Sequence, residues 1–544
     1  MLWKFWQNPE FIRHCRSELR RSRMTTVALV VLFVCGLTIL ACWAAARAQM
    51  TYYHSQPLVL VQPPIPSAAP AQRSNEASDD DAEQPSRALS SRAEPTIASA
   101  TALKSYYPLM LMQFGVLTFW SLLSCTQGIS RERERNTWDF QRTTRLAPSE
   151  LLVGKLLGEP VLAYFIFLCA LPVTLVTGIV GRVPVLKILL ADFVTVIAAL
   201  FIGIAGLWVS SLFENKSRGI ALIGGLAIYG MFLGSTGLGD SPFSGLAGFS
   251  PLTTFLPLLG RVFSPVALAP MLFGARVPWL LMTVLLYVTF GAWLLLMLVR
   301  NLKKDVNEMR LLSHWQAVGC CAFLNFVLYA VLDPTRGNPF GTASDFVSFM
   351  VLINGIIFFF LGVAMLSPSE RIDPESLLSA RSFFSGNGLQ WPWLMISAIV
   401  SYLLLIWGLY MWKDQIGFDG HLIGWGAVSM LIVLVFITRD VLFIQWCKLT
   451  RLRSPLVKGV LFLGLYYAGT AVLYSVMDVT SHSAATGLAQ VLTPVAAFTR
   501  SSALVPTSAV AGIIVQVMAI AFLISAIRGR VQEIELVPVA AAGD

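Results

Sequence analysis

The apolar runs of this chain limit its fold more than any other feature, because they recur along nearly its whole length and each covers about 18 residues or more. A run of that length crosses the hydrocarbon core of a bilayer as one helix. Only 13% of the 544 residues are charged, whereas a soluble protein carries roughly 25% charged residues. We therefore expect an all-α fold: a polytopic helical membrane protein with about twelve transmembrane helices.

The candidate spans fall into two sets of six. The first set lies near 25–46, 107–128, 158–180, 188–212, 219–237 and 278–299, and the second near 314–332, 346–366, 391–412, 421–438, 459–476 and 507–527. In each set a shorter segment interrupted by proline precedes the last helix, at Pro251–Leu259 and Pro494–Leu504. We expect these two segments to be re-entrant or interfacial. The pairing predicts an internal duplication, with a first six-helix permease half over 25–312 and a second, divergent six-helix half over 313–544.

The N-terminal stretch 1–24 is basic and begins a helix before the first span. Asn8, Pro9 and Glu10 form a helix start, with a capping side chain, a proline at the first helical position and an acid in the first turn. Apolar residues follow at helical spacing: Phe11, Ile12, Cys15 and Leu19. We expect an amphipathic helix on the cytoplasmic surface.

The charges between the spans set the orientation. With the N-terminus in the cytoplasm, 27 of the 39 Lys and Arg residues fall on the cytoplasmic side and 12 on the other. The positive-inside rule therefore predicts cytoplasmic N- and C-termini in the cell (inner) membrane. The stretch 47–104 is then external, and its Pro, Ser, Ala and Gln content predicts a disordered loop.

The stretch 128–158 reads GISRERERNTWDFQRTTRLAPSELLVGKLLG and is too long for a simple connection, since helix connections usually run about 2–8 residues. It contains S-R-E-R-E at 130–134, then Thr137, Pro148 and Glu150, then Gly-Lys-Leu at 154–156. This pattern resembles the cytoplasmic segment of the type-2 family of ABC transporter permeases, and Asn8-Pro9 with the basic helix resembles the opening of that family. The resemblance covers the first half well and the second half only by helix layout.

The resemblance implies that 129–156 is a cytoplasmic coupling segment that docks into a groove of a separate ATPase subunit. Its assigned residues are Arg131, Glu132, Arg133, Glu134, Asn136, Thr137, Trp138, Pro148, Glu150, Gly154 and Lys155. Asn136 replaces the usual glycine of the family, and we expect the turn to survive because asparagine tolerates positive φ well. We also expect the charges of Glu132 and Glu134 to be exposed. The alternative is a charged surface helix that anchors the second and third spans at the head groups.

At the matching place in the second half, Glu370, Arg371 and Glu375 form a candidate second coupling segment. This stretch keeps an acid–base pair but lacks the Thr and the Gly-Lys of the first. An ordinary polar loop is the equal alternative.

Motifs for nucleotide binding, metal binding and catalysis do not occur in the sequence. Gly154-Lys155 is followed by Leu156, so there is no G-x-x-x-x-G-K-[ST] motif. The eight cysteines and five histidines show no CxxC or HExxH spacing. We therefore expect a transport subunit that is not an enzyme, with no metal, no catalytic residues and no cofactor in this chain, and with ATP on a partner subunit.

These observations predict the membrane-spanning permease subunit of an ABC transporter, an exporter by family resemblance, with a separate P-loop ATPase subunit and the lipid bilayer as partners and no nucleic acid. The alternative is a twelve-helix secondary transporter without an ATPase partner. Such a carrier usually places charges near the membrane midplane, whereas Glu159, Asp192 and Asp440 fall near the predicted ends of spans. A fused pseudo-dimer and a homodimer both stay open, as do lipid, drug, polysaccharide and ion substrates.

The orientation gives a direct prediction for single-cysteine variants in a cysteine-free background. A membrane-impermeant maleimide added to intact cells should label a cysteine at position 80 and leave one at position 140 unlabelled, because only the first is external. Labelling is read on the purified protein, and permeabilised cells give the control in which both positions react. Labelling of position 140 but not position 80 in intact cells would reverse the orientation.

Overall fold

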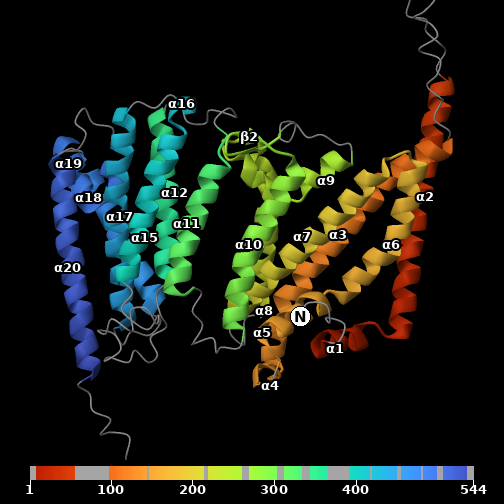
Figure 1. The fold of residues 1–544 in the computed structure, drawn as a ribbon, viewed down its shortest axis with the longest axis horizontal. Helices are drawn as coiled ribbons and strands as arrows, with labels where there is room; N and C mark the ends of the chain where they lie inside the picture. Colours follow the sequence, from red (N-terminus) through yellow and green to blue (C-terminus); the bar gives the residue numbers. More distant parts are fainter. Residues whose placement is uncertain are drawn as a thin grey trace, which may run out of the picture. The chain divides into compact units, whose positions relative to one another are not determined.

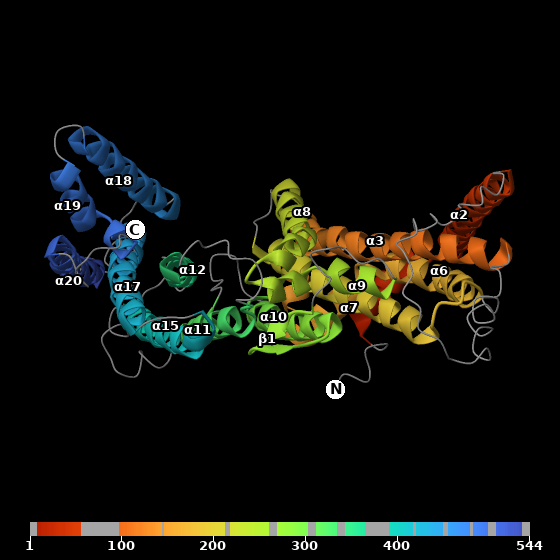
Figure 2. The same ribbon diagram turned by 90° about the horizontal axis from the view of Figure 1, so that it is seen from above.

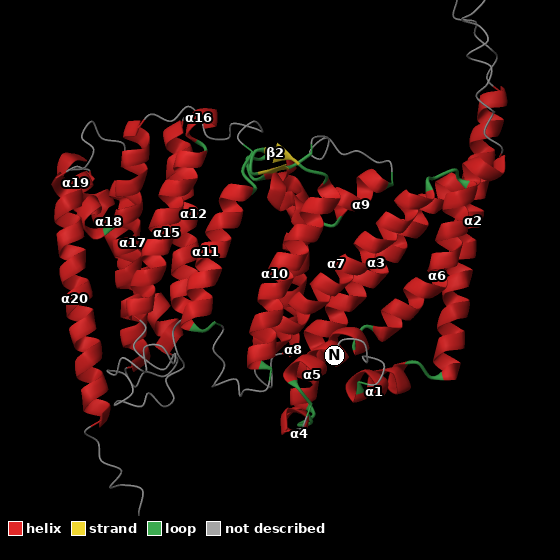
Figure 3. Cartoon of the chain, viewed as in Figure 1, coloured by secondary structure: helices red, strands yellow, loops and turns green. Residues whose placement is uncertain are grey.

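A computed structural model describes residues 8–55, 97–143, 146–212, 218–259, 269–302, 312–333, 343–364, 391–416, 420–449, 455–478, 482–498 and 507–535. Nearly all of these residues are helical, and the strands among them are two short ones, β1 (Met271–Leu272) and β2 (Ala275–Arg276), paired as an antiparallel hairpin (Figure 3). The expected all-α class is confirmed.

Among the described residues, eleven helices are long and apolar enough to cross a membrane, so the protein is a multi-pass membrane protein. Each of the twelve predicted spans contains a helix. The span predicted at 314–332 is α11 (His314–Ala330), which has 17 residues. Helix α8 (Arg218–Gly234) is equally short, but a 3-10 helix follows it directly. These two are the shortest of the twelve helices. The two proline-interrupted segments contain the short helices α9 (Leu252–Leu258) and η6 (Pro494–Ala497). The division into two six-helix halves stays a prediction.

The chain forms two compact units: 1–128, 153–207 and 255–261 make the first, and 129–152, 208–254 and 262–544 make the second. Helices of the first unit, some of which continue into the second, are α1 (Pro9–Glu18), α2 (Arg21–Ser55), α3 (Ile97–Glu134), α5 (Pro148–Gly158), α6 (Val161–Val180) and α7 (Val185–Leu212) (Figure 1). Both α2 and α3 extend beyond their apolar spans into the stretch predicted as an external loop, of which 56–96 lies outside the described residues.

The core of the first unit lies between α3, α6 and α7. Leu117 of α3 packs against Ala163 and Phe167 of α6 and Ala199 of α7. The α3 and α7 backbones approach closely because Gly206 has no side chain: a Cβ there would lie 3.2 Å from the Cβ of Cys125 and from the carbonyl oxygen of Leu122. Small residues at such contacts are typical of packed membrane helices.

The second unit contains the remaining elements (Figures 1 and 2). Before α11 these are α4 (Trp138–Thr143), α8, η2 (Ser235–Asp240), η3 (Ser244–Phe249) and α10 (Trp279–Asn301). After α11 they are α12 (Ala343–Ala364), α15 (Trp391–Met411), α16 (Lys413–Ile416), α17 (Gly420–Leu449), α18 (Pro455–Asp478), α19 (His482–Leu492) and α20 (Thr507–Glu535). Helix α17 packs on α12, α15, α18 and α20 and forms the centre of this bundle.

Tyr329 of α11 shows how tightly this bundle is packed. Its side chain is buried, its hydroxyl accepts a hydrogen bond from Nδ2 of Asn354 at 3.0 Å, and its carbonyl oxygen accepts one from Nε1 of Trp412 at 3.2 Å. A Cβ added at Gly408 of α15 would overlap the Tyr329 ring. One bond holds the tip of the ring and the other holds the backbone of Tyr329, so the ring cannot easily move away from such a side chain.

We predict that Gly408→Ala destabilises the second unit by about 1–3 kcal/mol, the usual cost of overpacking a core. Gly464→Ala is the matched control, because a Cβ at that position of α18 has no atom within 4 Å. Alanine there should be neutral or stabilising by up to about 1 kcal/mol, because glycine is a poor helix former. Thermal unfolding of the two variants in detergent measures the difference, and equal melting temperatures would contradict the packing argument.

Candidate functional site

Helix α1 begins at the residues that the sequence indicates. The Asn8 side chain accepts hydrogen bonds from the backbone N–H groups of Glu10 at 3.0 Å and Phe11 at 3.4 Å, and Pro9 is the first helical residue. The expected helix start is therefore confirmed. The apolar residues of α1 are only partly buried, whereas Glu10 and His14 are fully buried, so the face that packs inward is a polar one.

Two glycines of α5 receive this face of α1. A Cβ at Gly154 would lie 2.8 Å from both the Oδ1 of Asn8 and the Cβ of Glu10, and a Cβ at Gly158 would lie 2.8 Å from the Cδ2 of His14. The two glycines are four residues apart and therefore share one face of α5. This G-x-x-x-G spacing lets the two helices approach until side chains of α1 contact the α5 backbone.

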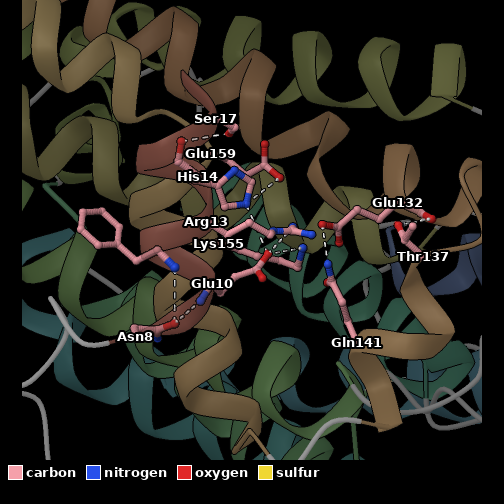
Figure 4. Close-up of polar contacts among 11 residues, drawn as sticks. Asn8, Glu10, Arg13, His14, Ser17, Glu132, Thr137, Gln141, Lys155 and Glu159 are labelled. Carbon is pink, nitrogen blue, oxygen red and sulfur yellow. Dashed lines mark hydrogen bonds and ion pairs between the residues drawn. The ribbon is translucent and has the colours of Figure 1, made fainter. Parts of the chain in front are cut away.

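Between the two glycines, Lys155 is fully buried and its ammonium group lies 3.5 Å from Oε1 of Glu10 (Figure 4). The same carboxylate accepts a hydrogen bond from Nη2 of Arg13 at 2.6 Å and lies 3.3 Å from Nε2 of His14. The Nε2 atom of His14 is also 3.8 Å from Oε1 of Glu159. Burial of an ammonium group without a carboxylate beside it is strongly destabilising, and Glu10 supplies a carboxylate for Lys155.

The electrostatics of Glu10 follow from these contacts. Burial alone raises the pKa of the carboxyl group, but the hydrogen bond with His14 and the charges of Lys155, Arg13 and His14 outweigh it and lower the pKa from its usual 4.5 to about 2. The stabilisation from the ionised form is thus fully present above pH 4.5 and is lost only as the pH falls through about 2. At neutral pH the Glu10 carboxylate is therefore ionised and stabilises the contact between α1 and α5.

In the second unit, the coupling segment starts with the end of α3 and a tight turn. Asn136 has φ of 55°, as its replacement of glycine predicts. The Asn136 N–H donates to the carbonyl of Arg133 at 3.0 Å, and the Thr137 N–H donates to the carbonyl of Glu132 at 3.0 Å. These two bonds form a Schellman motif, which ends α3 and satisfies two of its last carbonyl groups.

The short helix α4 is then fixed to the end of α3 by buried side chains. The carboxylate of Glu132 accepts a hydrogen bond from Nε2 of Gln141 at 2.8 Å, and both side chains are buried (Figure 4). Nη1 of Arg133 donates to the carbonyl of Ser211 at 3.2 Å, and its guanidinium group lies 5.8 Å from the centre of the buried Trp138 ring. The expectation that Glu132 is exposed is therefore wrong, because the turn folds α4 back over it. Arg133 and Trp138 likewise stabilise the segment itself.

The exposed face of this segment carries other residues. Glu134 and Asn136 are exposed, and Phe140 is 75% exposed on α4. Pro148 is the first residue of α5, and Glu150 accepts a hydrogen bond from the Ala147 N–H at 3.1 Å. Arg131 is half-buried and Thr137 is exposed, with its hydroxyl donating to the carbonyl of Glu132 at 3.2 Å.

The sequence analysis missed Glu10, His14 and Gln141 as parts of this region. The G-x-x-x-G spacing of Gly154 and Gly158 could have indicated that α5 receives another helix, but not which one. The candidate second coupling segment, with Glu370, Arg371 and Glu375, lies outside the described residues. None of the eight cysteines, all of which lie in the described part of the chain, forms a disulfide.

The comparison with protein families agrees with this architecture. Residues 65–275 match the family described as ABC-2 family transporter protein, which includes the coupling segment and most of the first predicted half. No curated protein and no solved structure matches the chain. Over this stretch the chain is similar to type-2 ABC transporter permeases, and the match covers 211 of its 544 residues.

We predict that Glu10→Gln loosens α1 from α5 by about 3 kcal/mol, because it removes the negative charge that lies 3.5 Å from the buried Lys155 ammonium group. Tryptic cleavage after Arg13 and Arg16 measures the loosening, since cleavage follows the population of the open form. Glu18→Gln is the matched control, because Glu18 lies on the same helix and pairs with Arg23 in an exposed contact. Equal cleavage rates in both variants would contradict a structural role for Glu10.

Proposed function

We propose that this chain is the membrane subunit of an ABC transporter and that a separate P-loop ATPase subunit drives it. The transporter works as an exporter. Helix α4 delivers the motion of the ATPase subunit to α3. The observation that carries the proposal is the build of α4, a six-residue helix with a buried base and an exposed aromatic tip. Its base is held by the Glu132–Gln141 hydrogen bond and by Trp138. Its tip is Phe140, a large apolar side chain that is exposed.

An exposed aromatic on a rigid support suits contact with a soluble partner. Aromatic side chains dominate the binding energy of protein interfaces when they insert into a pocket of the partner. Glu134, at the end of α3, is exposed as well, and exposed charges at an interface guide association more than they add affinity. Only three residues, 135–137, separate α3 from α4, and two backbone hydrogen bonds fix this turn, so a displacement of α4 would be passed on as a rigid movement.

Two further parts of the proposal rest on family resemblance and charge distribution. The cytoplasmic placement of α4 and of both termini rests on the excess of Lys and Arg on one side. Export as the direction of transport rests on the resemblance to type-2 permeases. The ATP would bind on the partner, and one chain could supply either a complete set of helices or one half of a dimer.

The rival reading, a secondary transporter, gains one observation from the structure. Arg439 and Asp440 are both buried in α17, whereas the sequence placed them at the end of a span. A carrier would use such charges to bind a coupling ion. Uptake into inside-out vesicles distinguishes the two hypotheses. An ABC exporter requires ATP and the ATPase subunit for uptake, whereas a carrier requires only an ion gradient.

We predict that Phe140→Asp weakens binding of the ATPase subunit by about 2 kcal/mol, roughly thirtyfold in Kd, because a charge replaces an interface anchor. Binding is measured by titrating the purified ATPase onto the purified permease in nanodiscs. The matched control is Phe273→Asp, which changes a Phe that is 51% exposed at the β1–β2 hairpin, on the side predicted to be external. If Phe140→Asp binds the ATPase with parental affinity and transports at the parental rate, α4 is not the contact, and the head-group anchor reading stands.

A further inference from the structure

Helix α17 buries a pair of opposite charges within the bundle of the second unit. Nε of Arg439 donates to Oδ1 of Asp440 at 2.8 Å, and Nη2 donates to the same oxygen at 2.5 Å. The span was predicted to end at 438, but α17 continues for ten residues beyond Arg439 to Leu449. Ionisable groups inside a membrane helix are costly, and they persist where they are paired and have a role.

The pair joins four helices through neutral partners. Nη1 of Arg439 donates to Oε1 of Gln516 on α20 at 2.7 Å, and Nη2 donates to the Tyr467 hydroxyl on α18 at 3.1 Å. The Tyr467 hydroxyl donates in turn to Oδ2 of Asp440 at 2.6 Å. Tyr466 donates to the carbonyl of Leu492 at the end of α19 at 2.7 Å. Both hydrogen-bonding functions of the Tyr467 hydroxyl are thus used, and its ring is held in one position.

That fixed ring forms a wall of a cavity of about 640 Å³ between α18 and the segment from α19 to η6. Figures 1 and 2 show α18, α19 and α20 gathered around α17. Cavities of about 300–1,000 Å³ hold ligands of drug size. Because the Tyr467 side chain is already fixed, its ordering costs little conformational entropy when a ligand binds.

The lining indicates the chemistry of the occupant. Seven of the eleven lining residues carry a hydroxyl or an amide group, and none of the eleven carries a charge: Tyr467, Thr470, Tyr474, Ser475, Thr486, Gln490 and Thr493 are the polar ones. An ionic head group would find no opposite charge here. The hydroxyl groups of Thr470, Ser475 and Thr493 donate to backbone carbonyls, so their oxygens are left to accept a hydrogen bond from a ligand hydroxyl group.

The position of the cavity indicates where the occupant comes from. In the most apolar stretch of α18 no residue is buried within the described part of the chain. Its large side chains Leu461, Leu465, Val472 and Val476 are all well exposed. A helix with such a surface faces the acyl chains of a bilayer, so a ligand can reach the cavity laterally from the membrane.

We propose that the cavity between α18 and α19 binds an uncharged, hydroxyl-bearing lipid of the diacylglycerol type, and that the Arg439–Asp440 network holds its wall in the binding position. The head group lies among the hydroxyl and amide groups, and the acyl chains extend along α18 into the bilayer. This site does not depend on the ATPase or on the direction of transport.

The test uses the full chain in phosphatidylcholine vesicles that contain a photoreactive, alkyne-tagged diacylglycerol. After irradiation, labelled peptides are mapped by mass spectrometry, and we expect labelling in α18 and α19. Ala471→Trp fills the cavity, because Ala471 lines it. Labelling there should fall about tenfold, which corresponds to about 1.4 kcal/mol of lost binding. Ala468→Trp is the matched control on the same helix, because Ala468 is exposed and does not line the cavity.

A second variant and a second probe keep the test independent of folding effects. Gln490→Leu keeps the approximate volume but removes the amide, and it should lower labelling while the protein stays monodisperse. Photoreactive phosphatidic acid, which is anionic, should label the α18 and α19 peptides weakly in the parental protein. Equal labelling of Ala471→Trp and Ala468→Trp would show that the label reports only lipids on the protein surface, and this would overturn the proposal. Labelling by phosphatidic acid as strong as that by diacylglycerol, or crosslinks to a second protein chain instead, would also overturn it.

Discussion

The buried contact between Lys155 and Glu10 is the interaction on which the packing of α1 against α5 depends. An ammonium group with no exposed surface needs a carboxylate close by. The carboxylate comes from α1, a helix 145 residues earlier in the chain, and it can reach Lys155 because Gly154 and Gly158 leave room on both sides. Charge and shape therefore specify the same contact. A side chain at either glycine would separate the charges, and loss of either charge would leave the close approach without its stabilising pair.

The two units use buried charges in different ways. At Glu10 one carboxylate serves several cations, and the net effect is to hold a surface helix against the body of the protein. At Arg439 one cation serves a carboxylate, an amide and two phenols, and the net effect is to fix the distances between membrane helices. The first arrangement includes a partly exposed cation, Arg13. The second lies where water is scarce, so nearly every donor of the guanidinium group has its own partner.

What could be predicted from the sequence was mostly local. The cap at Asn8, the positive φ of Asn136 and the twelve helical segments each follow from a few neighbouring residues. The errors concern side chains whose partners are distant in the chain or fold back over them. Glu132 looked exposed because its pattern is charged, but Gln141 covers it after the turn. Asp440 was predicted near the end of a span because hydropathy falls at Arg439. Helix α17 nevertheless continues to Leu449, and the Arg439 side chain finds partners on α18 and α20. Composition alone gives no sign of such pairings.

The way α3 ends has a mechanical consequence. Helix α3 is a continuous rod of 38 residues, which at about 1.5 Å per residue is roughly 57 Å long. Its first compliant point, counted from the coupling end, is Pro108, where a backbone hydrogen bond is missing. This proline lies about 39 Å from Glu134. A force applied at α4 would therefore reach the far part of the rod almost undiminished before it could be taken up as bending. Helix α3 is therefore stiff from Glu134 back to Pro108, and the proline that allows it to bend lies far from α4.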